Sequence, residues 1–278
     1  MTTLSDIEFI LLILATGGYL VATGVYWRFL FAGRVPPHWW ASRLASAALL
    51  AHIIWFGIRA YHAGHLPFYN GHEFSASFAG GIVLVALIFE RLSQRRDLGA
   101  FALPIVLALL AYAWTLPRGV GPLIPIFKSL WMQVHVLTAI VAYACFATTF
   151  AASCLYLLMD RQGAAGSDQS ATLALLDRIA YQVTIVGFPF MTVCVISGAI
   201  WSDHVWGRYW TWDPKETWSL ITWLFFAAYL HTRYKQGWRQ RKAAILAIIG
   251  FLTVLMNFIG VELIYQYSDA TFFGFGKG

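Results

Sequence analysis

The segment from Trp206 to Trp218, WGRYWTWDPKETW, carries the side chains in this sequence best suited to hold a ligand. It combines four tryptophans with an aspartate, a glutamate and two cations. Indole rings form flat walls for a planar molecule, and arginine and lysine pair with acidic groups. This pattern favours a large planar ligand with acidic arms, such as haem. A belt at the lipid headgroups also gathers tryptophan and tyrosine, but it requires no fixed Trp-Asp-Pro-Lys-Glu order.

The charged residues of this segment have two interpretations each. Aspartate is a preferred N-cap, proline is favoured at the first helical position, and glutamate three residues after the cap closes a capping box. We therefore assign Asp213 and Glu216 chiefly to starting the next helix, with direct ligand contact as the alternative. Arg208 and Lys215 would pair with haem propionates or with water and lipid headgroups.

Three histidines lie in apolar stretches, where an ionisable side chain indicates function. His135, near the start of a long apolar stretch, is predicted to be an axial haem ligand or a hydrogen-bonded interfacial histidine. His231 lies roughly 22 Å below the tryptophan segment along its helix. It would belong to a second site near the cytoplasmic side, or lie at the interface beside Arg233. His52 lies in the middle of a predicted span. It is interpreted as a second ligand opposite His231 or, slightly favoured, as a hydrogen-bond partner between helices.

Composition predicts an all-α polytopic membrane protein, with residues 1–278 as a single transmembrane domain. Hydrophobic residues make up 59% of the chain and charged residues 12%, whereas soluble domains carry about 25% charged residues. Because a spanning helix needs about 20 apolar residues, we predict spans at about 7–31, 41–61, 74–92, 98–116, 130–159, 179–201, 218–234 and 241–265. The segment 163–170 is predicted to be a flexible loop.

The basic residues predict the orientation in the membrane, since cytoplasmic loops are enriched in lysine and arginine. The larger set lies on one side of the predicted spans: Arg28, Arg34, Arg43, Arg91, Arg95, Arg96, Arg161, Arg178, Arg233, Lys235, Arg239, Arg241 and Lys242. The smaller set lies on the other side: Arg59, Arg118, Lys128, Arg208, Lys215 and Lys277. Both termini and the tryptophan segment then face outward, to a periplasm or a thylakoid lumen. Cations scattered in this way contact membrane lipid and do not favour nucleic acid.

The predicted outer loops, 61–73, 117–129 and about 202–217, concentrate histidine and aromatic residues, so we expect the chemistry on this face. The three cysteines, Cys145, Cys154 and Cys194, lie in apolar runs without a CxxC or CxxCH motif. They are therefore interpreted as packing residues, which disfavours thiol redox chemistry and covalent haem attachment to this chain.

These residues together resemble the CcsA (ResC) family, the WWD-domain membrane proteins that handle haem in System II cytochrome c biogenesis. The family pattern WGxxWxWDxKE fits Trp206, Gly207, Trp210, Trp212, Asp213, Lys215 and Glu216. An outer-loop pattern near GHxPxxNxxE fits Gly64, His65, Pro67, Asn70 and Glu73, and YLHTR fits the segment after the tryptophans. The CcmC proteins share the tryptophan motif but fit less well in span number.

The resemblance implies non-covalent haem b, moved through the membrane to the outer surface and presented to the CxxCH thiols of apocytochrome c. It also implies a CcsB/ResB-type membrane subunit, with which the chain would form a holocytochrome c synthase, a haem lyase. In this comparison His135 matches the outer ligand before the WWD loop, and His231 matches the membrane ligand after it. The other membrane ligand belongs to the partner subunit.

One departure from the family pattern leaves an alternative function open. The family has a second outer histidine after its last span, near GVNxxxxGLHSY, whereas this chain reads GVELIYQYSDATFFGFG. His65, His72 and His204 are the outward-facing substitutes, and Tyr265 or Tyr267 is a weaker option. The loss also fits a haem-binding assembly factor without lyase activity, similar to HemX or CcmC. A transporter is disfavoured, because the sequence has neither inverted repeats nor broken helices.

Overall fold

The computed structural model of the protein describes residues 3–31, 39–95, 97–121, 123, 125–161 and 167–261. These residues form α-helices joined by short connections, with one short 3-10 turn at Pro125–Phe127. The helices are α1 Leu4–Phe31, α2 Trp39–Ala63, α3 Gly71–Ser93, α4 Gly99–Thr115, α5 Leu130–Arg161, α6 Ser167–Trp206, α7 Pro214–Lys235 and α8 Gln240–Leu255, which continues as a π-helical turn, Met256–Gly260.

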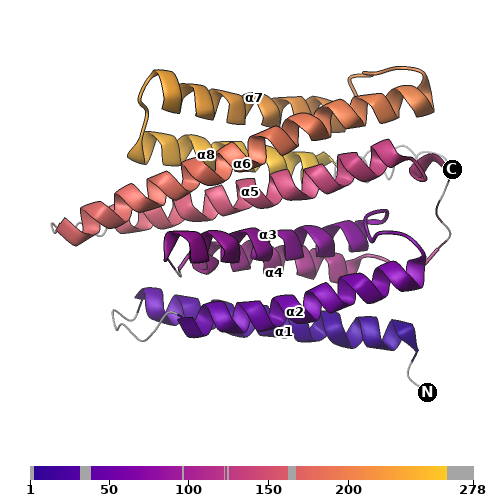
Figure 1. Ribbon diagram of the computed structural model, residues 1–278, viewed down its shortest axis with the longest axis horizontal. Coiled ribbons are helices and arrows are strands. Elements are labelled where there is room, and N and C mark those ends of the chain that lie inside the picture. Colours follow the sequence, from indigo (N-terminus) through magenta and orange to yellow (C-terminus); the bar gives the residue numbers. More distant parts are fainter. Residues whose placement is uncertain are drawn as a thin grey trace, which may run out of the picture.

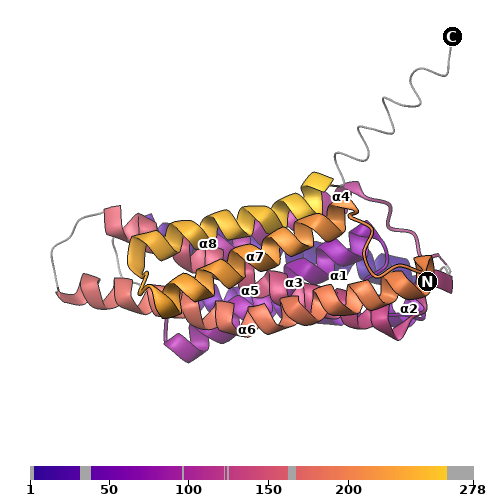
Figure 2. The ribbon, with the colours of Figure 1, turned by 90° about the horizontal axis from the view of Figure 1, so that it is seen from above.

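The helices stack as successive pairs along one direction of the molecule (Figure 1). Helices α1 and α2 form one edge, α3 and α4 follow, α5 and α6 come next, and α7 and α8 form the other edge. Seen from above, the helices run along the common long axis (Figure 2). We call the end where α6 passes into α7 the tryptophan end, and the end where α7 passes into α8 the opposite end.

The predicted all-α fold is confirmed, and each predicted span corresponds to one helix in the described part of the chain; residues 262–265 of the last predicted span lie outside it. Six helices, α1, α2, α3, α5, α6 and α8 with its π turn, are long and apolar enough to cross a membrane. Helix α4 is apolar but has only 17 residues, and α7 is not among the spans selected by length and hydropathy. These two helices would cross as members of the bundle, since α4 packs against α1, α3 and α5, and α7 packs against α6 and α8. Each helix satisfies its backbone hydrogen bonds internally.

Helix α6 is longer than predicted at both ends. It begins at Ser167, so residues 167–170 are helical, and residues 163–166 of the predicted flexible loop lie outside the described residues. It also continues to Trp206, which shortens the predicted loop 202–217 to residues 207–213, the tryptophan loop. Gly207 adopts φ +67° and its N–H donates to the Asp203 carbonyl at 2.8 Å. Glycine accepts this left-handed conformation without steric cost, which is why the helix ends there.

The predicted capping box at the start of α7 is confirmed. The Asp213 carboxylate accepts a hydrogen bond from the Lys215 N–H at 2.7 Å, and the Glu216 carboxylate accepts one from the Asp213 N–H at 3.3 Å. Glu216 also accepts from the Thr211 N–H at 2.7 Å. The two acidic residues therefore tie the end of the tryptophan loop to the first turn of α7.

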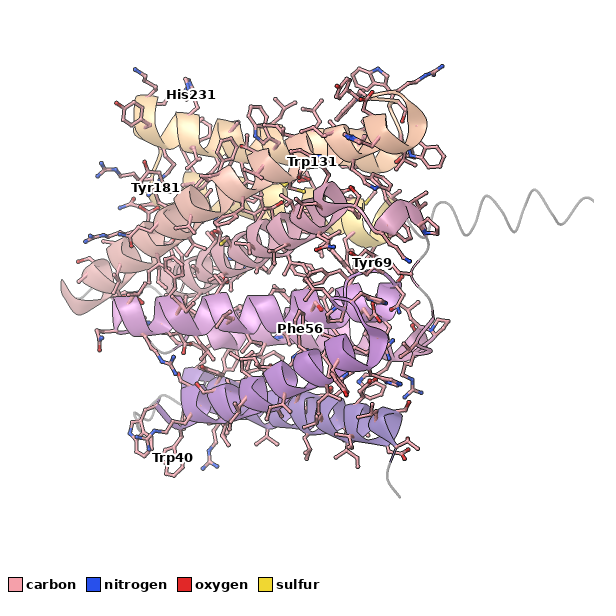
Figure 3. The ribbon with its side chains drawn as sticks, turned by 45° about the vertical axis from the view of Figure 1, so that its right-hand side comes forward. Trp40, Phe56, Tyr69, Trp131, Tyr181 and His231 are labelled. Atoms are coloured by element: carbon pink, nitrogen blue, oxygen red, sulfur yellow. The ribbon has the colours of Figure 1, made fainter. Side chains whose placement is uncertain are left out.

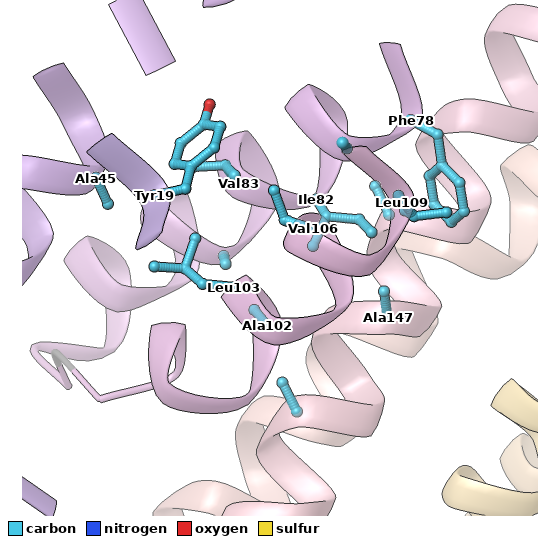
Figure 4. Packing of buried hydrophobic residues seen from close by; sticks show 14 of the residues in the cluster. Tyr19, Ala45, Phe78, Ile82, Val83, Ala102, Leu103, Val106, Leu109 and Ala147 are labelled. Atoms are coloured by element: carbon cyan, nitrogen blue, oxygen red, sulfur yellow. The ribbon is translucent and has the colours of Figure 1, made fainter. Parts of the chain in front are cut away.

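The core is built on close helix contact between small and aromatic residues. In the centre of the bundle, side chains of α3 such as Phe78 and Ile82 pack against Val106 and Leu109 of α4 (Figure 4). Between α5 and α6 the approach is closer, since a Cβ on Gly187 would lie 2.6 Å from the Cβ of Cys145. Small residues permit such contact between membrane helices, so α5 and α6 form a tight pair.

Candidate functional site

A cavity of about 1100 Å³ opens at the tryptophan end of the bundle. Its walls come from α3, the end of α4, the first turns of α5, the last turns of α6, the tryptophan loop and the π turn after α8. Small-molecule sites usually measure about 300–1,000 Å³, so this cavity has room for a large ligand. Most of its lining surface is apolar, with a small number of polar side chains among the aromatic rings.

The tryptophan loop supplies one wall of this cavity. Arg208, Trp210 and Asp213 of the loop line it. Trp206 at the end of α6 and Lys215 and Glu216 in the first turn of α7 extend the same wall. The buried indole Nε1 of Trp210 has no hydrogen-bond partner among the residues that the structure describes. A buried donor of this kind normally finds a partner, so the Trp210 N–H can donate a hydrogen bond to an acceptor atom of a ligand.

Two residues of the predicted motif lie outside the cavity lining. Gly207 ends α6, and Trp212 is 70% exposed with a left-handed backbone, φ 60°. The ring of Trp212 meets that of Trp210 edge to face, with centroids 5.8 Å apart. Trp212 therefore contacts the wall from its outer side, whereas Trp210 forms the wall.

His135 lies in the second turn of α5 and lines the same cavity. Its Nδ1 lies 2.8 Å from the backbone carbonyl of Cys194 in α6. A carbonyl only accepts, so Nδ1 carries the proton and Nε2 keeps its lone pair. A Cβ on Gly198 would lie 2.6 Å from Nδ1, which shows how closely α6 confines the ring. The fold thus fixes the orientation and the tautomer of this imidazole, as around metal-bound histidines.

His72, in the first turn of α3, is a second histidine of the cavity lining. It is buried, and its Nδ1 lies 2.9 Å from the carbonyl of Ala113. The ring meets the edge of Trp55 at a centroid distance of 6.0 Å. By the same reasoning as for His135, its Nδ1 is the donor and Nε2 keeps the lone pair.

The other two substitutes considered from the sequence do not line the cavity. His65 packs against the Tyr69 ring at 5.0 Å, and its Nδ1 bonds the Leu66 carbonyl at 2.9 Å. His204 is exposed in the last turn of α6, where its Nδ1 bonds the Ile200 carbonyl at 2.7 Å. Tyr265 and Tyr267 lie outside the described residues. Among the described residues, His72 is therefore the substitute that reaches the cavity of His135.

The structure does not bring His52 and His231 together within one chain. His52 is buried in the edge formed by α1 and α2, with its Nδ1 3.2 Å from the Tyr19 hydroxyl. His231 is exposed near the opposite end of α7, far along that helix from the tryptophan loop (Figure 3). Since α2 and α7 form opposite edges of the stack, a shared ligand between these histidines would need a second chain. The contact with Tyr19 joins α1 to α2, which agrees with the interpretation of His52 as a hydrogen-bond partner between helices.

A buried charge cluster at the tryptophan end was missed by sequence reasoning. Arg59 of α2 pairs with Glu8 of α1 and with Glu73 of α3, each at 2.9 Å, and all three side chains are buried. His62 adds a contact to Glu8 at 2.6 Å. In the sequence, Arg59 indicates orientation, but a cation inside an apolar span is also a sign of function.

Arg59 also reaches the wall of the cavity through its neighbours. Its guanidinium donates to the carbonyls of Arg118 at 3.0 Å and Gly119 at 3.2 Å. Pro117, directly before Arg118, and His72, directly before the ion-pair partner Glu73, both line the cavity. The Arg59 cluster therefore holds together two segments of the cavity wall that are distant in sequence.

Comparison with known proteins assigns the family to which this chain belongs. The cytochrome c assembly protein family matches residues 69–267. The CcsA cytochrome c biogenesis protein of Synechococcus elongatus is 35% identical over 273 residues, covering 80% of this chain and 82% of that protein. The CcsA protein of a Synechocystis strain is 34% identical and covers 94% of both chains. The relative from Pyropia yezoensis is 32% identical over 90% of this chain.

A solved structure shares the fold at lower sequence similarity. The cytochrome c heme lyase CcmF superposes with a TM-score of 0.64 at 18% identity, covering 93% of this chain and 47% of that chain. At this identity the likeness concerns the helical architecture alone.

The fold, the spans and these relatives define a multi-pass integral membrane protein that takes part in cytochrome c biogenesis. The chain belongs to the cytochrome c assembly protein family and, within it, to the CcsA cytochrome c biogenesis proteins.

Proposed function

We propose that the cavity at the tryptophan end binds one haem b non-covalently, with His135 as an axial ligand through Nε2. The observation that carries this proposal is the bond from His135 Nδ1 to the Cys194 carbonyl. It leaves Nε2 as the metal-binding nitrogen and holds the ring in place before any ligand arrives. Among the described residues no partner for Nε2 is found.

The lining of the cavity supports haem over a smaller ligand. Indole rings from Trp206 and Trp210 suit the faces of a porphyrin, and Arg208 and Lys215 suit its propionates. We propose His72 as the second axial ligand, in place of the C-terminal histidine that the family pattern has. The support is that it lines the same cavity with its Nδ1 also on a backbone carbonyl.

The biological role follows from this site. We propose that the tryptophan end faces the periplasm or thylakoid lumen and that the whole chain forms one haem-handling domain. There it would present haem to apocytochrome c together with a CcsB/ResB-type subunit, with His231 as a ligand of an inner site completed by that subunit. Bound haem supplies the vinyl groups that take the two CxxCH thiols. The residues of this chain contribute position, orientation and charge.

The direct test is the absorption spectrum of the detergent-purified chain, expressed alone, oxidised and then reduced with dithionite. A Soret band with sharp α and β bands in the reduced state would support two strong axial ligands. His72→Ala should then convert the spectrum to a high-spin form. A chain that binds haem but does not raise cytochrome c yield, even with its partner subunit, would favour the assembly factor over the lyase. Purified protein that takes up no added haem would sink the proposal.

Trp210 and Trp212 provide a matched pair of substitutions. We expect Trp210→Ala to lower haem occupancy severalfold, because an aromatic pair is worth about 0.5–1.5 kcal/mol beyond its buried area and Trp210 lines the cavity. Trp212→Ala should have a smaller effect, since that ring is 70% exposed. The measurement is the ratio of Soret absorbance to protein at equal expression. Equal losses in the two variants would contradict the assignment of Trp210 as the wall.

Gly198 tests the orientation of His135 without changing the ligand. A Cβ at this position would lie 2.6 Å from His135 Nδ1, so Gly198→Ala should push the imidazole away from the Cys194 carbonyl. We expect lower haem occupancy and an altered axial-ligand spectrum, with a loss of about 1–3 kcal/mol in stability from overpacking. Gly24→Ala is the control, because nothing lies within 4 Å of its added Cβ. An unchanged spectrum in Gly198→Ala would mean that the ring position is not critical.

A further inference from the structure

A second cavity lies at the opposite end of the bundle from the tryptophan loop. It measures about 390 Å³ and is formed by α4, the last two turns of α5 and the first turns of α8. Its interior wall is apolar and includes Phe101, Cys154, Leu157, Leu158, Ile245 and Ile248. The polar side chains of its lining are Arg161, Arg241 and Asp160, from the end of α5 and the start of α8. The cavity is thus a slot with an apolar interior and a charged mouth.

The two guanidinium groups at the mouth are available to a ligand. Both side chains are exposed, and in the described part of the chain neither Arg161 nor Arg241 makes a hydrogen bond or an ion pair. Two other arginines of this end are engaged in ion pairs: Arg233 bonds Asp177, and Arg95 bonds Asp97. The mouth therefore has a net positive charge, with one carboxylate offsetting one of the two cations.

The start of α8 adds to this positive potential. Its N-cap residue, Arg239, makes no side-chain capping bond. The first-turn N–H groups of a helix carry a partial positive charge and favour anions. The Gln240 N–H is taken by the Asp177 carboxylate at 2.9 Å, but Arg241 follows directly and lies at the mouth of the slot.

We infer that this slot binds one anionic phospholipid, with its phosphate between Arg161 and Arg241 and an acyl chain against the apolar wall. The ends of membrane-spanning helices lie at the depth of the lipid headgroups, where basic pockets between helices recognise acidic lipids. The arginines at the mouth suit a phosphate, and the apolar wall suits an acyl chain. A phospholipid of the surrounding membrane carries both groups. This site is separate from the cavity at the tryptophan end and does not depend on haem binding there.

The test is native mass spectrometry of the full chain in detergent, titrated with phosphatidylglycerol or with phosphatidylcholine. We expect phosphatidylglycerol to bind about fivefold more tightly, because one net cation near a headgroup is worth about 1 kcal/mol. Arg161→Gln with Arg241→Gln should reverse this preference, because it leaves the Asp160 carboxylate alone at the mouth, whereas Asp160→Asn should raise the preference to about 25-fold by removing that carboxylate. The opposite signs of these variants separate recognition of charge from loss of structure.

Matched controls and a local probe locate the lipid. Arg28→Gln with Arg178→Gln removes two exposed cations that do not line the slot, and it should keep the preference. Cys154 lines the slot, so phosphatidylglycerol should slow its alkylation by N-ethylmaleimide in the parent chain and not in the double arginine variant. A preference for phosphatidylglycerol that survives the double variant would overturn the inference. So would alkylation of Cys154 that is slowed by haemin but not by phosphatidylglycerol.

Discussion

Replacing His135 by glycine is expected to remove most of the haem from the purified protein, and free imidazole is expected to restore it. His135 is the one histidine on α5, and its Nε2 is the nitrogen that would bind iron. Helix α6 holds the ring in place through the Cys194 carbonyl. We expect haem affinity to fall by at least about tenfold, since even the partners of a metal-bound histidine are worth about 10- to 100-fold. The measurement is haem occupancy by Soret absorbance, with and without added imidazole.

Imidazole rescue separates ligation from structural damage. The missing ring leaves a space between α5 and α6 into which free imidazole fits, so the spectrum of the rescued variant should approach that of the parent. His204→Gly is the matched control, because this histidine is exposed and does not line the cavity. A parent-like spectrum in His135→Gly without imidazole would reject His135 as the ligand.

Arg59→Gln is expected to have the largest effect on stability. The substitution leaves Glu8 and Glu73 buried without their cation. Breaking a buried ion pair by removing one partner costs about 3–5 kcal/mol. The measurement is the thermal unfolding midpoint of the detergent-solubilised chain, followed together with haem occupancy. We expect both to fall, because the same guanidinium ties the 118–119 carbonyls to the first turn of α3 beside the cavity.

Two comparison variants show whether the bonds or the charge matter. Arg59→Lys keeps the charge but cannot reproduce the planar fork that bonds two carboxylates and two carbonyls, so it should recover only part of the stability. Arg118→Gln removes an exposed cation of the same region, whose guanidinium lies over the Phe9 and Trp114 rings at 5.4 and 5.1 Å. It should lower the midpoint much less, because a cation–π contact at an exposed site is worth about 0.5–1 kcal/mol. A loss in Arg118→Gln as large as in Arg59→Gln would contradict the role given to the buried cluster.

Local signals made the fold predictable from the sequence. The capping box at Asp213 follows from neighbouring residues alone, and apolar runs locate the helices to within a few residues. The exception is α6, which begins at Ser167, well before the predicted start at 179. The end of α6 was missed because Ser202, Asp203 and His204 are polar and read as a loop. A helix that extends beyond the apolar part of the membrane tolerates polar residues, so polarity alone does not mark its end.

The contacts that shape the site join residues far apart in sequence. The depth of His135 was predictable from its place near the start of a span. Its partner Cys194 lies 59 residues further along, however, and Glu8 lies 51 residues before Arg59. No periodicity or propensity connects such positions, since packing in three dimensions alone brings them together. The sequence therefore shows Arg59 as an orientation signal, whereas in the structure it joins α1, α3 and the 118–119 carbonyls.

The use of a main-chain carbonyl to hold His135 has a consequence for sequence variation at position 194. Every residue type presents the same carbonyl there, and the Cys194 Sγ, 3.5 Å from His135 Nδ1, adds only a weak acceptor. The side chain at this position can therefore vary so long as it remains small enough for the tight pair of α5 and α6. What cannot drift is the axial register of the two helices, because one residue of slippage would offer the ring a different carbonyl. We therefore expect Cys194→Ala to keep the parent haem spectrum, while a single-residue insertion in α6 between positions 187 and 194 should abolish it.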